Sequence, residues 1–547
     1  MIRFFVLFSA WALATTAVAA LDPVAYVHGE LARGVRKVCV PRGRYEVSPS
    51  GRHAFYLKGL QDVTIDFSGS ELVGKVKTCM FQLDSCTNTV LRNVVIDYDP
   101  LPFTQARIEE VGPNGEWTVR IVDGYPKPSG KELQESFWPI QAYDPATGET
   151  VNPMRFRDGV RIDEIGGGSY RISGGIDRRG RVGDIAVWSI RDHSRPVVAG
   201  TINSSGCVGC IFEDITEYAT PHGCAYNESA ATANVYRRCR IVRRDLEDDP
   251  VRRGMGRFRS GNHDAFNSRC SFVGPVIEQC RFEYHCDDCV NISGYYALVT
   301  GQKGDIVRCV CISSKPFEPA DTCQVMTFDG KCPQDVRVTD VIPDGKASEA
   351  DVRFFETLSL WPGLAQLCRH AVKVRIPGKI SLVPGSVLIS NRRMGNGFSI
   401  RDCVLGHARA NGVLIKASCG RIERNEIASC VGSAVRLSPE YEWTEGGCSR
   451  DVVIRDNVLR DNGAFGIDVS GYGGAHKPLP ADSHFNFTVV GNKIVGRGTG
   501  VRIAGCTGLI LVGNSVEVED GRSPAYFMEN VLSVTSDVGG ANRGAEE

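Results

Sequence analysis

A short motif recurs along the C-terminal third of this 547-residue chain and constrains its fold more than any other feature. Each copy is a strand-like segment of alternating apolar and polar residues, and the aligned positions are Cys403, Asn425, Asn457, Asn492 and Asn514. They are separated by steps of 22, 32, 35 and 22 residues. A step in the low twenties is about one coil of a solenoid, and the longer steps fit coils with turn insertions. Stacked asparagines hold tight corners through hydrogen bonds from side chain to backbone.

Almost no stretch of the chain has helical periodicity, and short alternating strands also precede the repeat. The chain is therefore predicted to be all-β, a right-handed parallel β-helix. Two segments without the coil step, 105–194 and 297–391, contain several strands with Gly and Pro turns and are predicted to be inserted small β-barrels. These insertions either flank a cleft or have no role in the site. The predicted organisation is a signal peptide (1–19), N-terminal coils (20–104), the first barrel (105–194), central coils with candidate catalytic acids (195–296), the second barrel (297–391), C-terminal coils (392–534) and a tail (535–547).

The N-terminus has the features of an export signal. Met1-Ile2-Arg3 is positively charged, residues 4–14 are apolar, and Ala17-Val18-Ala19 supplies small residues for cleavage. A membrane anchor would need about 20 apolar residues and no cleavage site, and no later segment is long and apolar enough to span a bilayer. We therefore expect an exported protein, periplasmic or extracellular, without a membrane span after signal removal.

Charge and cysteine content limit the partners and cofactors. There are 63 basic and 64 acidic residues, so the chain as a whole does not attract nucleic acid or an anionic membrane, and a neutral partner fits better. An exported chain with 21 cysteines is expected to contain some disulfides as well as buried thiols. Cys207-x-x-Cys210 and Cys286-x-x-Cys289 resemble half zinc sites, but neither has a second pair at the required spacing. We predict no metal and no other cofactor.

Two acidic turns make the segment 261–294 the candidate active site. His263-Asp264 and Asp287-Asp288 place their leading carboxylates 23 residues apart, about one coil, so Asp264 is expected to stack above Asp287. Asp288 shares their cleft only if the second turn is a corner of the coil. Two carboxylates a few ångströms apart are what glycosidic bond cleavage requires, and their repulsion keeps one of them protonated. The alternative is that these acids only cap turns.

Further candidates lie on the next coils and in a charged loop. Arg409 occupies the phase of the acidic turn, with Lys416 on the following strand; such donors hold sugar hydroxyls, or else bridge coils. The insertion 439–447 contains Glu440, Trp443 and Glu445, and an aromatic face there either stacks on a sugar ring or anchors the loop. The loop 245–261 is too polar for a core position, and either covers the acidic turns or is solvated.

At these residues the sequence resembles glycoside hydrolase family 110, exported α-1,3-galactosidases with a parallel β-helix and inserted β-barrels. The motifs that carry the resemblance are Asp264-Ala265-Phe266, the strand 276–282, Asp287-Asp288 with Asn291, the turn and strand 409–415, the insertion 443–447, and the segment 97–105. Together they cover most of the mature chain in the expected order. The second acidic turn departs from the family pattern at His285, Cys286 and 289–294, which puts the exact sugar in doubt.

The resemblance implies an exo-acting inverting hydrolase, without a metal, that releases terminal α-1,3-linked galactose from a glycan. It implies that Asp287 is the general acid and that Asp264 and Asp288 direct the attacking water. Inversion needs an acid and a base roughly 6.5–9.5 Å apart, so either the turn splays Asp264 from Asp287 or Asp288 is the working base. The candidate substrate-binding residues are His263, His285, Asn291, Arg409, Lys416, Glu440, Trp443 and Glu445.

Two other functions fit parts of the sequence. A polysaccharide lyase on the same scaffold would hold Ca²⁺ with the clustered acids and use a basic residue such as Arg409 as its base, but the balanced charge provides no strongly basic cleft. A carbohydrate-binding solenoid without catalytic activity would tolerate replacement of Asp287.

Overall fold

The computed structural model describes residues 21–49, 51–75, 77–130, 140–151, 160–174, 180–190, 200–221, 223–332, 335–358, 360–361, 363–496, 498–519, 521, 523–537 and 542–543. The predicted signal peptide (1–19) and most of the predicted tail (535–547) lie outside these residues.

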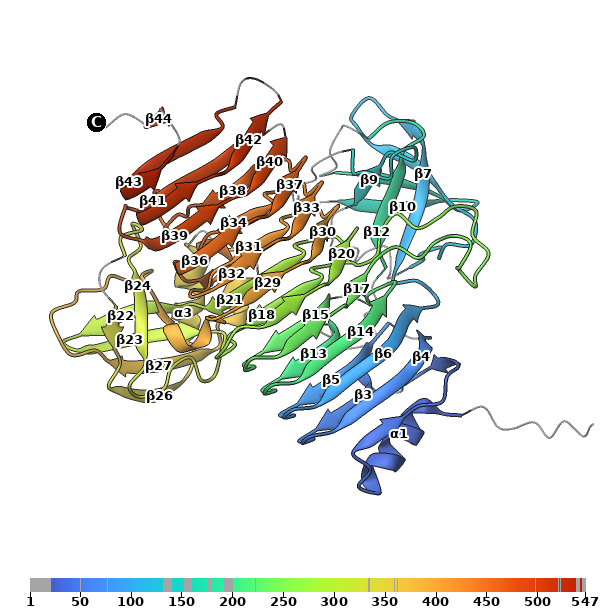
Figure 1. Cartoon of the computed structure of the whole chain (residues 1–547), viewed down its shortest axis with the longest axis horizontal. Helices are drawn as coiled ribbons and strands as arrows, with labels where there is room; N and C mark the ends of the chain where they lie inside the picture. Colours follow the sequence, from blue (N-terminus) through green and yellow to red (C-terminus); the bar gives the residue numbers. More distant parts are fainter. Residues whose placement is uncertain are drawn as a thin grey trace, which may run out of the picture.

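The chain is a solenoid whose strands stack in register from coil to coil (Figure 1). Its coils contribute strands to three ladders, and all pairings within these ladders are parallel. We call the first the site ladder, because the candidate acids lie at the ends of its strands. It consists of β3 (His53–Lys58), β5 (Cys79–Asp84), β13 (Gly200–Ser205), β15 (Cys224–Ser229), β18 (Phe266–Arg269), β21 (Val290–Tyr295), β31 (Val413–Ile415), β34 (Val435–Leu437), β38 (Phe465–Val469), β41 (Thr499–Val512), β43 (Tyr526–Ser536) and β44 (Asn542–Arg543).

The other two ladders share several long strands that turn a corner of the coil. The second ladder consists of β1 (Lys37–Cys39), β4 (Thr64–Gly74), β6 (Val90–Tyr98), β14 (Ile211–Glu217), β16 (Val235–Arg237), β19 (Val276–Glu278), β29 (Ser399–Arg401), β32 (Arg421–Glu423), β36 (Arg450–Arg455), β39 (His484–Val490), β41 and β43. The third consists of β2 (Arg44–Val47), β4, β6, β14, β17 (Arg240–Ile241), β20 (Arg281–Glu283), β30 (Val404–Gly406), β33 (Glu426–Ala428), β37 (Val458–Arg460), β40 (Lys493–Gly496) and β42 (Ser515–Val518). The predicted all-β class and parallel β-helix are confirmed.

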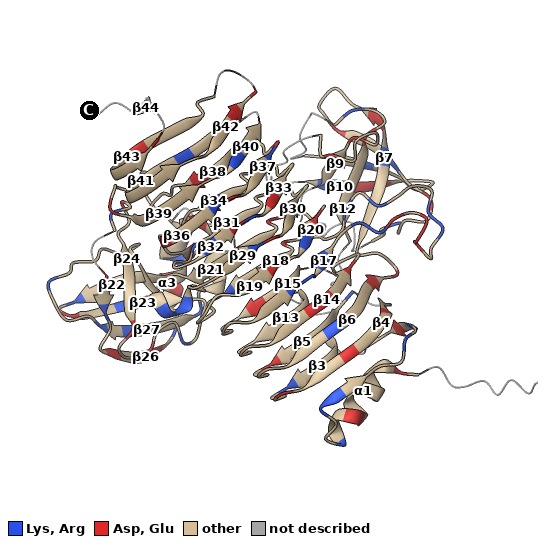
Figure 2. Cartoon of the chain, viewed as in Figure 1, with Lys and Arg blue, Asp and Glu red and all other residues tan. Residues whose placement is uncertain are grey.

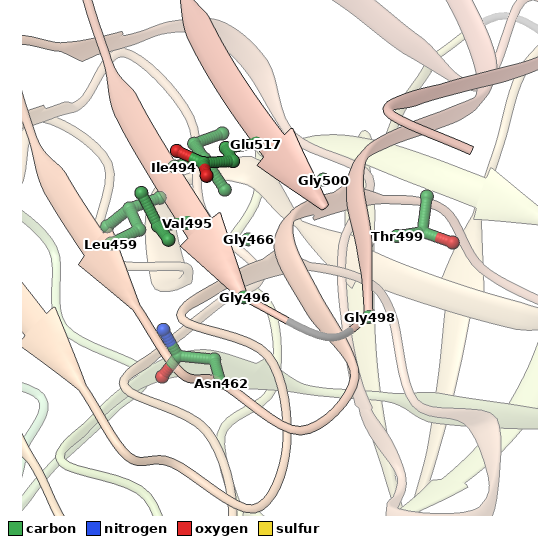
Figure 3. Close-up of a pocket in the computed structure, with 10 residues that line it drawn as sticks. All are labelled: Leu459, Asn462, Gly466, Ile494, Val495, Gly496, Gly498, Thr499, Gly500 and Glu517. Carbon is green, nitrogen blue, oxygen red and sulfur yellow. The ribbon is translucent and has the colours of Figure 1, made fainter. Parts of the chain in front are cut away.

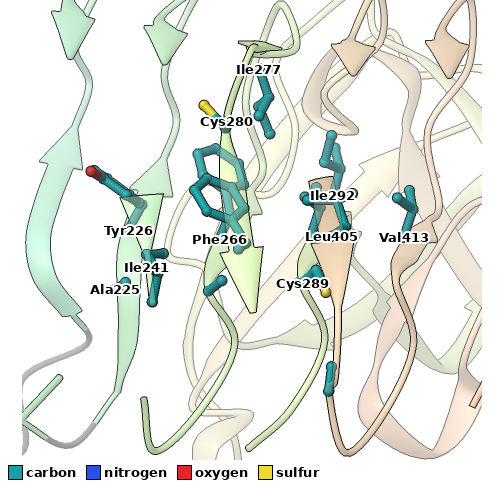
Figure 4. Packing of buried hydrophobic residues seen from close by; sticks show 14 of the residues in the cluster. Ala225, Tyr226, Ile241, Phe266, Ile277, Cys280, Cys289, Ile292, Leu405 and Val413 are labelled. Atoms are coloured by element: carbon teal, nitrogen blue, oxygen red, sulfur yellow. The ribbon is translucent and has the colours of Figure 1, made fainter. Parts of the chain in front are cut away.

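Side-chain alternation along each strand produces the core of the solenoid. On the site ladder Phe266, Val290 and Val413 share one register row and point inward, and Figure 4 shows Phe266 and Val413 in the interior. Aromatic rings stack between coils in the same way, with the Phe55 and Phe81 centroids 4.6 Å apart. Because neighbouring residues on a strand face opposite sides, the alternate positions form a polar outer face on which a site can be built.

The predicted asparagine ladder is present. The Asn457 side chain donates to the Ile422 carbonyl and the Asn492 Oδ1, both at 2.9 Å, and accepts from the backbone and side chain of Asn425. Asn492 makes the same contact with Asn514, and the Cys403 amide donates to Asn425 at 3.0 Å. Each buried amide thus satisfies the backbone groups of a corner and joins it to the next coil.

The two interrupting segments form separate antiparallel sheets that project from the solenoid (Figure 1). The first has the order β10-β11-β8-β7-β12-β9, with β7 (Phe103–Val111), β8 (Trp117–Ile121), β9 (Gln141–Tyr143), β10 (Arg161–Gly166), β11 (Ser169–Ser173) and β12 (Ile185–Ser189). The second has the order β25-β24-β28-β22-β23-β27-β26, with β22 (Ala297–Lys303), β23 (Ile306–Cys311), β24 (Thr322–Met326), β25 (Val336–Arg337), β26 (Asp340–Lys346), β27 (His370–Arg375) and β28 (Val387–Ser390). No pairing among the described residues joins the two edge strands of either sheet, so closure into barrels and the domain limits stay predictions.

Among the described residues, the few helical segments lie outside the coils. They are α1 (Pro23–Ala32), α3 (Glu349–Glu356), α4 (Leu364–Leu367) and the 3₁₀ turns η1 (Asn391–Arg393) and η2 (Tyr441–Trp443). Helix α1, which lies in the segment predicted as N-terminal coils, was not expected; the Asp22 carboxylate caps it by accepting from the Val24 amide at 2.9 Å. Among the described residues, no helix is long and apolar enough to cross a membrane.

The charged loop 245–261 differs from its prediction, because Arg253, Arg257 and Arg259 are buried. Arg257 donates to Asp97 and Asp249 at 2.8 Å, and Arg253 donates to Asp249 at 2.9 Å. Arg259, which lies in the interior, donates to Gln141 of the first inserted sheet at 2.9 Å. The loop joins that sheet to the solenoid, because buried arginines require carboxylate or carbonyl partners.

The predicted disulfides are absent. All 21 cysteines are free thiols, most of them buried, and several donate to carbonyls of a neighbouring coil, as Cys280 does to Tyr236 at 3.4 Å. The expectation of buried thiols is therefore confirmed. Acidic and basic residues are interspersed along the ribbon in Figure 2, in agreement with the balanced composition.

Replacing Asn457 with alanine should destabilise the C-terminal coils, because it removes four hydrogen bonds and leaves buried groups unsatisfied. We expect a loss of about 3 kcal/mol, measured by urea unfolding. The exposed Lys493, beside the same ladder, supplies the control: Lys493→Ala should change stability by less than about 0.5 kcal/mol. Equal midpoints for the two variants would show that the ladder does not stabilise the coils.

Candidate active site

The two acidic turns lie in bends immediately before two adjacent strands of the site ladder. Asp264 precedes β18, and Asp287 and Asp288 precede β21, so the predicted corner is present. Phe266 pairs with Val290, a register step of 24 residues, which places Asp264 beside Asp288 rather than Asp287. The Asp288 amide accordingly donates to Asp264 Oδ1 at 3.2 Å. The expected stacking of Asp264 over Asp287 is wrong by one residue, because this coil contains 24 residues and not 23.

Asp264 is held in its ionised form by polar neighbours. Asn267, three residues further on, donates to its Oδ2 at 2.6 Å, and His263 Nδ1 lies 3.7 Å from its Oδ1. Burial alone would raise the pKa of Asp264, but His263, Asn267 and Arg269 together lower it well below the usual range. In return, although burial opposes it, the interaction with Asp264 raises the pKa of His263. Asp264 is therefore a carboxylate over the ordinary pH range.

The pKa values of Asp287 and Asp288 are raised, in contrast to that of Asp264. Burial and the charges of Asp287 and Asp264 raise the pKa of Asp288 well above its usual value, although the Asn411 backbone and side-chain amides donate to its Oδ1 at 2.7 and 2.9 Å. Burial also raises the pKa of Asp287; Arg409 opposes this rise and Asp264 adds to it. The side chain of Asp287 is 15% exposed, more than that of Asp264. The trio therefore combines one carboxyl whose pKa is lowered with two whose pKa values are raised, the pattern that pairs a base with an acid.

The same groups are the candidate ligands for a cation. One carboxylate oxygen from each of Asp264, Asp287 and Asp288 lies within 4.8 Å of the others, and Cys224, His263 and Asp264 form a second such group. Hard oxygen ligands of this kind suit Ca²⁺. Against a cation, Arg409 Nη2 already donates to Asp287 at 2.6 Å and supplies positive charge at this position.

Arg409 and Asn411 come from the next coil, and the structure brings both to the acids. Besides its contact with Asp287, Arg409 donates through Nε to the Cys286 carbonyl at 2.7 Å, so it orients the acidic turn and bridges the coils. Its position in the phase of the turn was predicted from the sequence. The alternative that Arg409 bridges coils is confirmed, and its contact with sugar hydroxyls stays a prediction.

A buried ion cluster borders the acids on the other side. Lys416 Nζ lies 3.0 Å from Glu440 and 2.8 Å from Glu445, and 3.4 Å from the Asn291 Oδ1. The two glutamates flank the turn η2, and β35 (Glu445–Gly446) pairs antiparallel with the end of β21. Lys416 is 0% exposed, so it positions these carboxylates and does not itself face a substrate.

Arg269 completes this cluster and was not identified from the sequence. Its guanidinium lies 3.3 Å from Glu445 and donates to the Tyr295 hydroxyl at 2.8 Å, and its side chain is 35% exposed. Strand alternation would have found it, because Arg269 lies two residues after Asn267 on β18 and shares its face. The open side of the site is formed by His263, Arg269, Asp287 and Glu440.

Two predicted substrate-binding residues have other contacts. His285 is completely buried and burial lowers its pKa to about 4, so it is a neutral residue behind the turn, and its expected contact with the substrate is wrong for this structure. Trp443 stacks on Trp361 with centroids 4.6 Å apart, the contact that a loop anchor would make. A sugar contact for Trp443 stays a prediction.

A small hollow between the C-terminal coils is unrelated to these acids. It has a volume of about 10 Å³ and is lined by residues such as Asn462, Ile494 and Glu517 (Figure 3). This volume suits at most about one water molecule.

No family model matches the chain. Among curated proteins, α-1,3-galactosidase B of Bacteroides thetaiotaomicron is 24% identical over 437 residues, 76% of this chain and 66% of that protein. α-1,3-Galactosidase B of Akkermansia muciniphila is 22% identical over 464 residues, 77% of this chain and 53% of that protein. The chain is a distant relative of these galactosidases. The resemblance to glycoside hydrolase family 110 is thereby confirmed, and the chain spans between half and two thirds of the length of these relatives.

Solved structures are similar only at a general level. The A-module of a mannuronan C-5 epimerase from Azotobacter vinelandii has a TM-score of 0.35 at 11% identity, covering 94% of each chain. A family 28 exopolygalacturonase from Yersinia enterocolitica has a TM-score of 0.33 at 10% identity, covering 91% of this chain and 72% of that one.

Replacing Lys416 with methionine should destabilise the protein by roughly 3–5 kcal/mol, because it removes the buried cation between Glu440 and Glu445 and leaves only Arg269 beside Glu445. Burial alone would raise the pKa of Glu445, but Lys416 helps to lower it below its usual value. This stabilisation is therefore present above the usual glutamate range and is lost as the pH falls, so the difference from wild type should narrow in acid.

Thermal unfolding at several pH values measures this effect. Arg421→Met is the matched control, since Arg421 pairs with Glu423 at 3.5 Å while remaining largely exposed, and its loss should cost no more than about 1 kcal/mol. A Lys416→Met variant as stable as this control at neutral pH would contradict a charge-paired cluster.

Proposed function

We propose that the chain is an exo-acting, inverting glycoside hydrolase that releases terminal α-1,3-linked galactose from glycans. The observation that carries this proposal is the trio Asp264, Asp287 and Asp288, whose nearest oxygens lie within 4.8 Å of one another and whose pKa values move in opposite directions. The homology to proteins named α-1,3-galactosidase supports the sugar and the linkage.

The geometry favours Asp287 as the general acid. It is the most exposed carboxyl of the trio, burial raises its pKa, and Arg409 fixes the orientation of its side chain. In the proposed step, protonated Asp287 gives its proton to the glycosidic oxygen as the bond from that oxygen to the anomeric carbon breaks.

Asp264 is assigned as the base that activates the attacking water, and Asp288 lies beside it. Asp264 is ionised and can accept a proton from water as the water oxygen bonds to the anomeric carbon from the opposite side. The nearest oxygens of Asp264 and Asp287 lie within 4.8 Å, closer than the roughly 6.5–9.5 Å of an inverting pair, so inversion requires the two carboxyls to separate when substrate and water bind. The products are galactose of inverted configuration, the β-anomer, and the shortened glycan. Asp288 interacts with Asp264 through its backbone amide and with Asn411 through its carboxyl, so it helps to fix this base.

One observation favours the lyase as the second candidate. The carboxylate trio has the ligand types that a Ca²⁺-dependent lyase needs. Hydrolysis that persists with EDTA separates the two functions, because the lyase requires its cation.

Export is also part of the proposal. Its support is the sequence of residues 1–19, and the test is detection of a mature N-terminus near Ala20 after expression in a host with a secretory pathway.

Asp287→Asn should lower hydrolysis by about 10²–10⁴-fold, because asparagine cannot donate the proton. NMR of an α-1,3-galactosyl disaccharide in the presence of EDTA should show early release of β-galactose by the wild type only. Asp402→Asn, an exposed residue paired with Arg424 at 2.8 Å, is the matched control and should retain full activity. Undiminished release by Asp287→Asn, or initial release of α-galactose, would overturn the assignment.

The pH profile tests the role of Arg409. Its positive charge lowers the pKa of Asp287, so Arg409→Gln should raise that pKa and move the alkaline limb of kcat/KM to higher pH, with a lower maximum. Arg409→Lys keeps a charge and should shift the limb less. A limb that stays in place, or moves to lower pH, would exclude Asp287 as the titrating acid.

A further inference from the structure

A polar groove lies on the outer face of the site ladder, on the N-terminal side of the acids. It has a volume of about 400 Å³ and crosses β3, β5, β13 and β15, which lie side by side in Figure 1. Its lining residues are Arg52, His53, Tyr56, Gln82, Asp84, Asn203, Ser204, Ser205, Asn227 and Ser229. None of them belongs to the proposed catalytic site.

Strand register connects the groove to that site. One row of the ladder contains Tyr56, Gln82, Asn203, Asn227 and Asn267 as successive partners. The last of these donates to Asp264, so the groove begins one strand away from a catalytic carboxylate, about 4.8 Å along the ladder.

A second row connects the groove to the partly exposed Arg269. Ser205, Ser229 and Arg269 are successive partners, and Arg269 contacts Glu445 at the open side of the site. A ligand lying along the ladder therefore meets continuous polar side chains from the acids to β3.

The chemistry of the groove suits an uncharged, hydroxyl-rich ligand. Its lining is mainly amides and hydroxyls, with one guanidinium, Arg52, and one carboxylate, Asp84. Burial lowers the pKa of His53, which keeps this ring neutral at ordinary pH. Paired donors and acceptors without a net charge match sugar hydroxyls and disfavour a polyanion.

Tyr56 adds an aromatic surface in a fixed orientation. It is 40% exposed, and its hydroxyl donates to Asp84 Oδ2 at 2.8 Å, while Gln82 donates to Asp84 Oδ1 at 2.6 Å. The ring is thus held in place before any ligand binds, which reduces the entropy cost of stacking against the apolar face of a sugar.

We propose that this groove binds the neutral oligosaccharide to which the terminal galactose is attached, so that the leaving group of the reaction lies across β15, β13, β5 and β3. This inference rests on the proposed hydrolase and adds the preference for extended, uncharged acceptor chains.

The test compares an α-1,3-galactosyl disaccharide with a neutral hexasaccharide that has the same terminal linkage. The wild type should have the higher kcat/KM on the hexasaccharide, and Tyr56→Ala should reduce this length preference roughly three- to tenfold through KM. Tyr56→Phe keeps the ring and should retain most of the preference. Tyr472→Ala, at an equally exposed tyrosine (41%) far along the solenoid, should retain all of it.

Ser229→Leu, which fills the groove, provides a second variant if Tyr56→Ala does not fold. A length preference that neither variant changes would overturn the proposal.

Saturation-transfer NMR with the hexasaccharide and the Asp287→Asn protein measures binding to the groove separately from hydrolysis. Binding that depends on Tyr56 without any hydrolysis by the wild type would refute the galactosidase and retain the groove, whereas hydrolysis with binding independent of Tyr56 would refute the groove alone.

Discussion

The parallel register between β18 and β21 is the constraint on which the candidate site depends. It sets Asp264 beside Asp288 and leaves Asp287 at the more exposed position of the same bend. Because the backbone of both turns is tied into the ladder, the three carboxylates are held close to one another. Burial and their mutual repulsion raise the pKa values of Asp287 and Asp288, whereas His263, Asn267 and Arg269 lower that of Asp264, so the trio offers both an acid and a base.

The surrounding ion pairs counterbalance this concentration of negative charge. Arg409 reaches Asp287 from the following coil, and Lys416 and Arg269 neutralise two glutamates next to it. Every one of these cations is fixed by an additional polar contact, so the charges are positioned rather than mobile. The site is therefore a rigid electrostatic arrangement whose open edge continues into neutral amides and hydroxyls along the same face.

Much of this could be predicted from the sequence, and the failures have physical reasons. The asparagine spacing predicted the coils because each corner reuses one set of hydrogen bonds, and the acidic turns followed from their phase. The stacking partner of Asp264 was wrong because one residue in a bend leaves no periodic signal. The burial of Arg257 and Arg259 was missed because their partners, Asp97 and Gln141, are distant in sequence. Helix α1 and the burial of His285 depend on neighbours that the repeat does not encode.

The contact between Asp287 and Arg409 spans 122 residues, and the whole second inserted sheet lies between them. During synthesis the chain emerges from its N-terminus, so the acidic turns are completed long before their guanidinium partner exists. Until then one edge of β21 has no partner strand, and the acids that precede it lack their cation. Strand edges of this kind favour association with other chains. The insertion therefore delays this pairing during synthesis, and a ribosome that stalls within it leaves the candidate acids without their guanidinium partner.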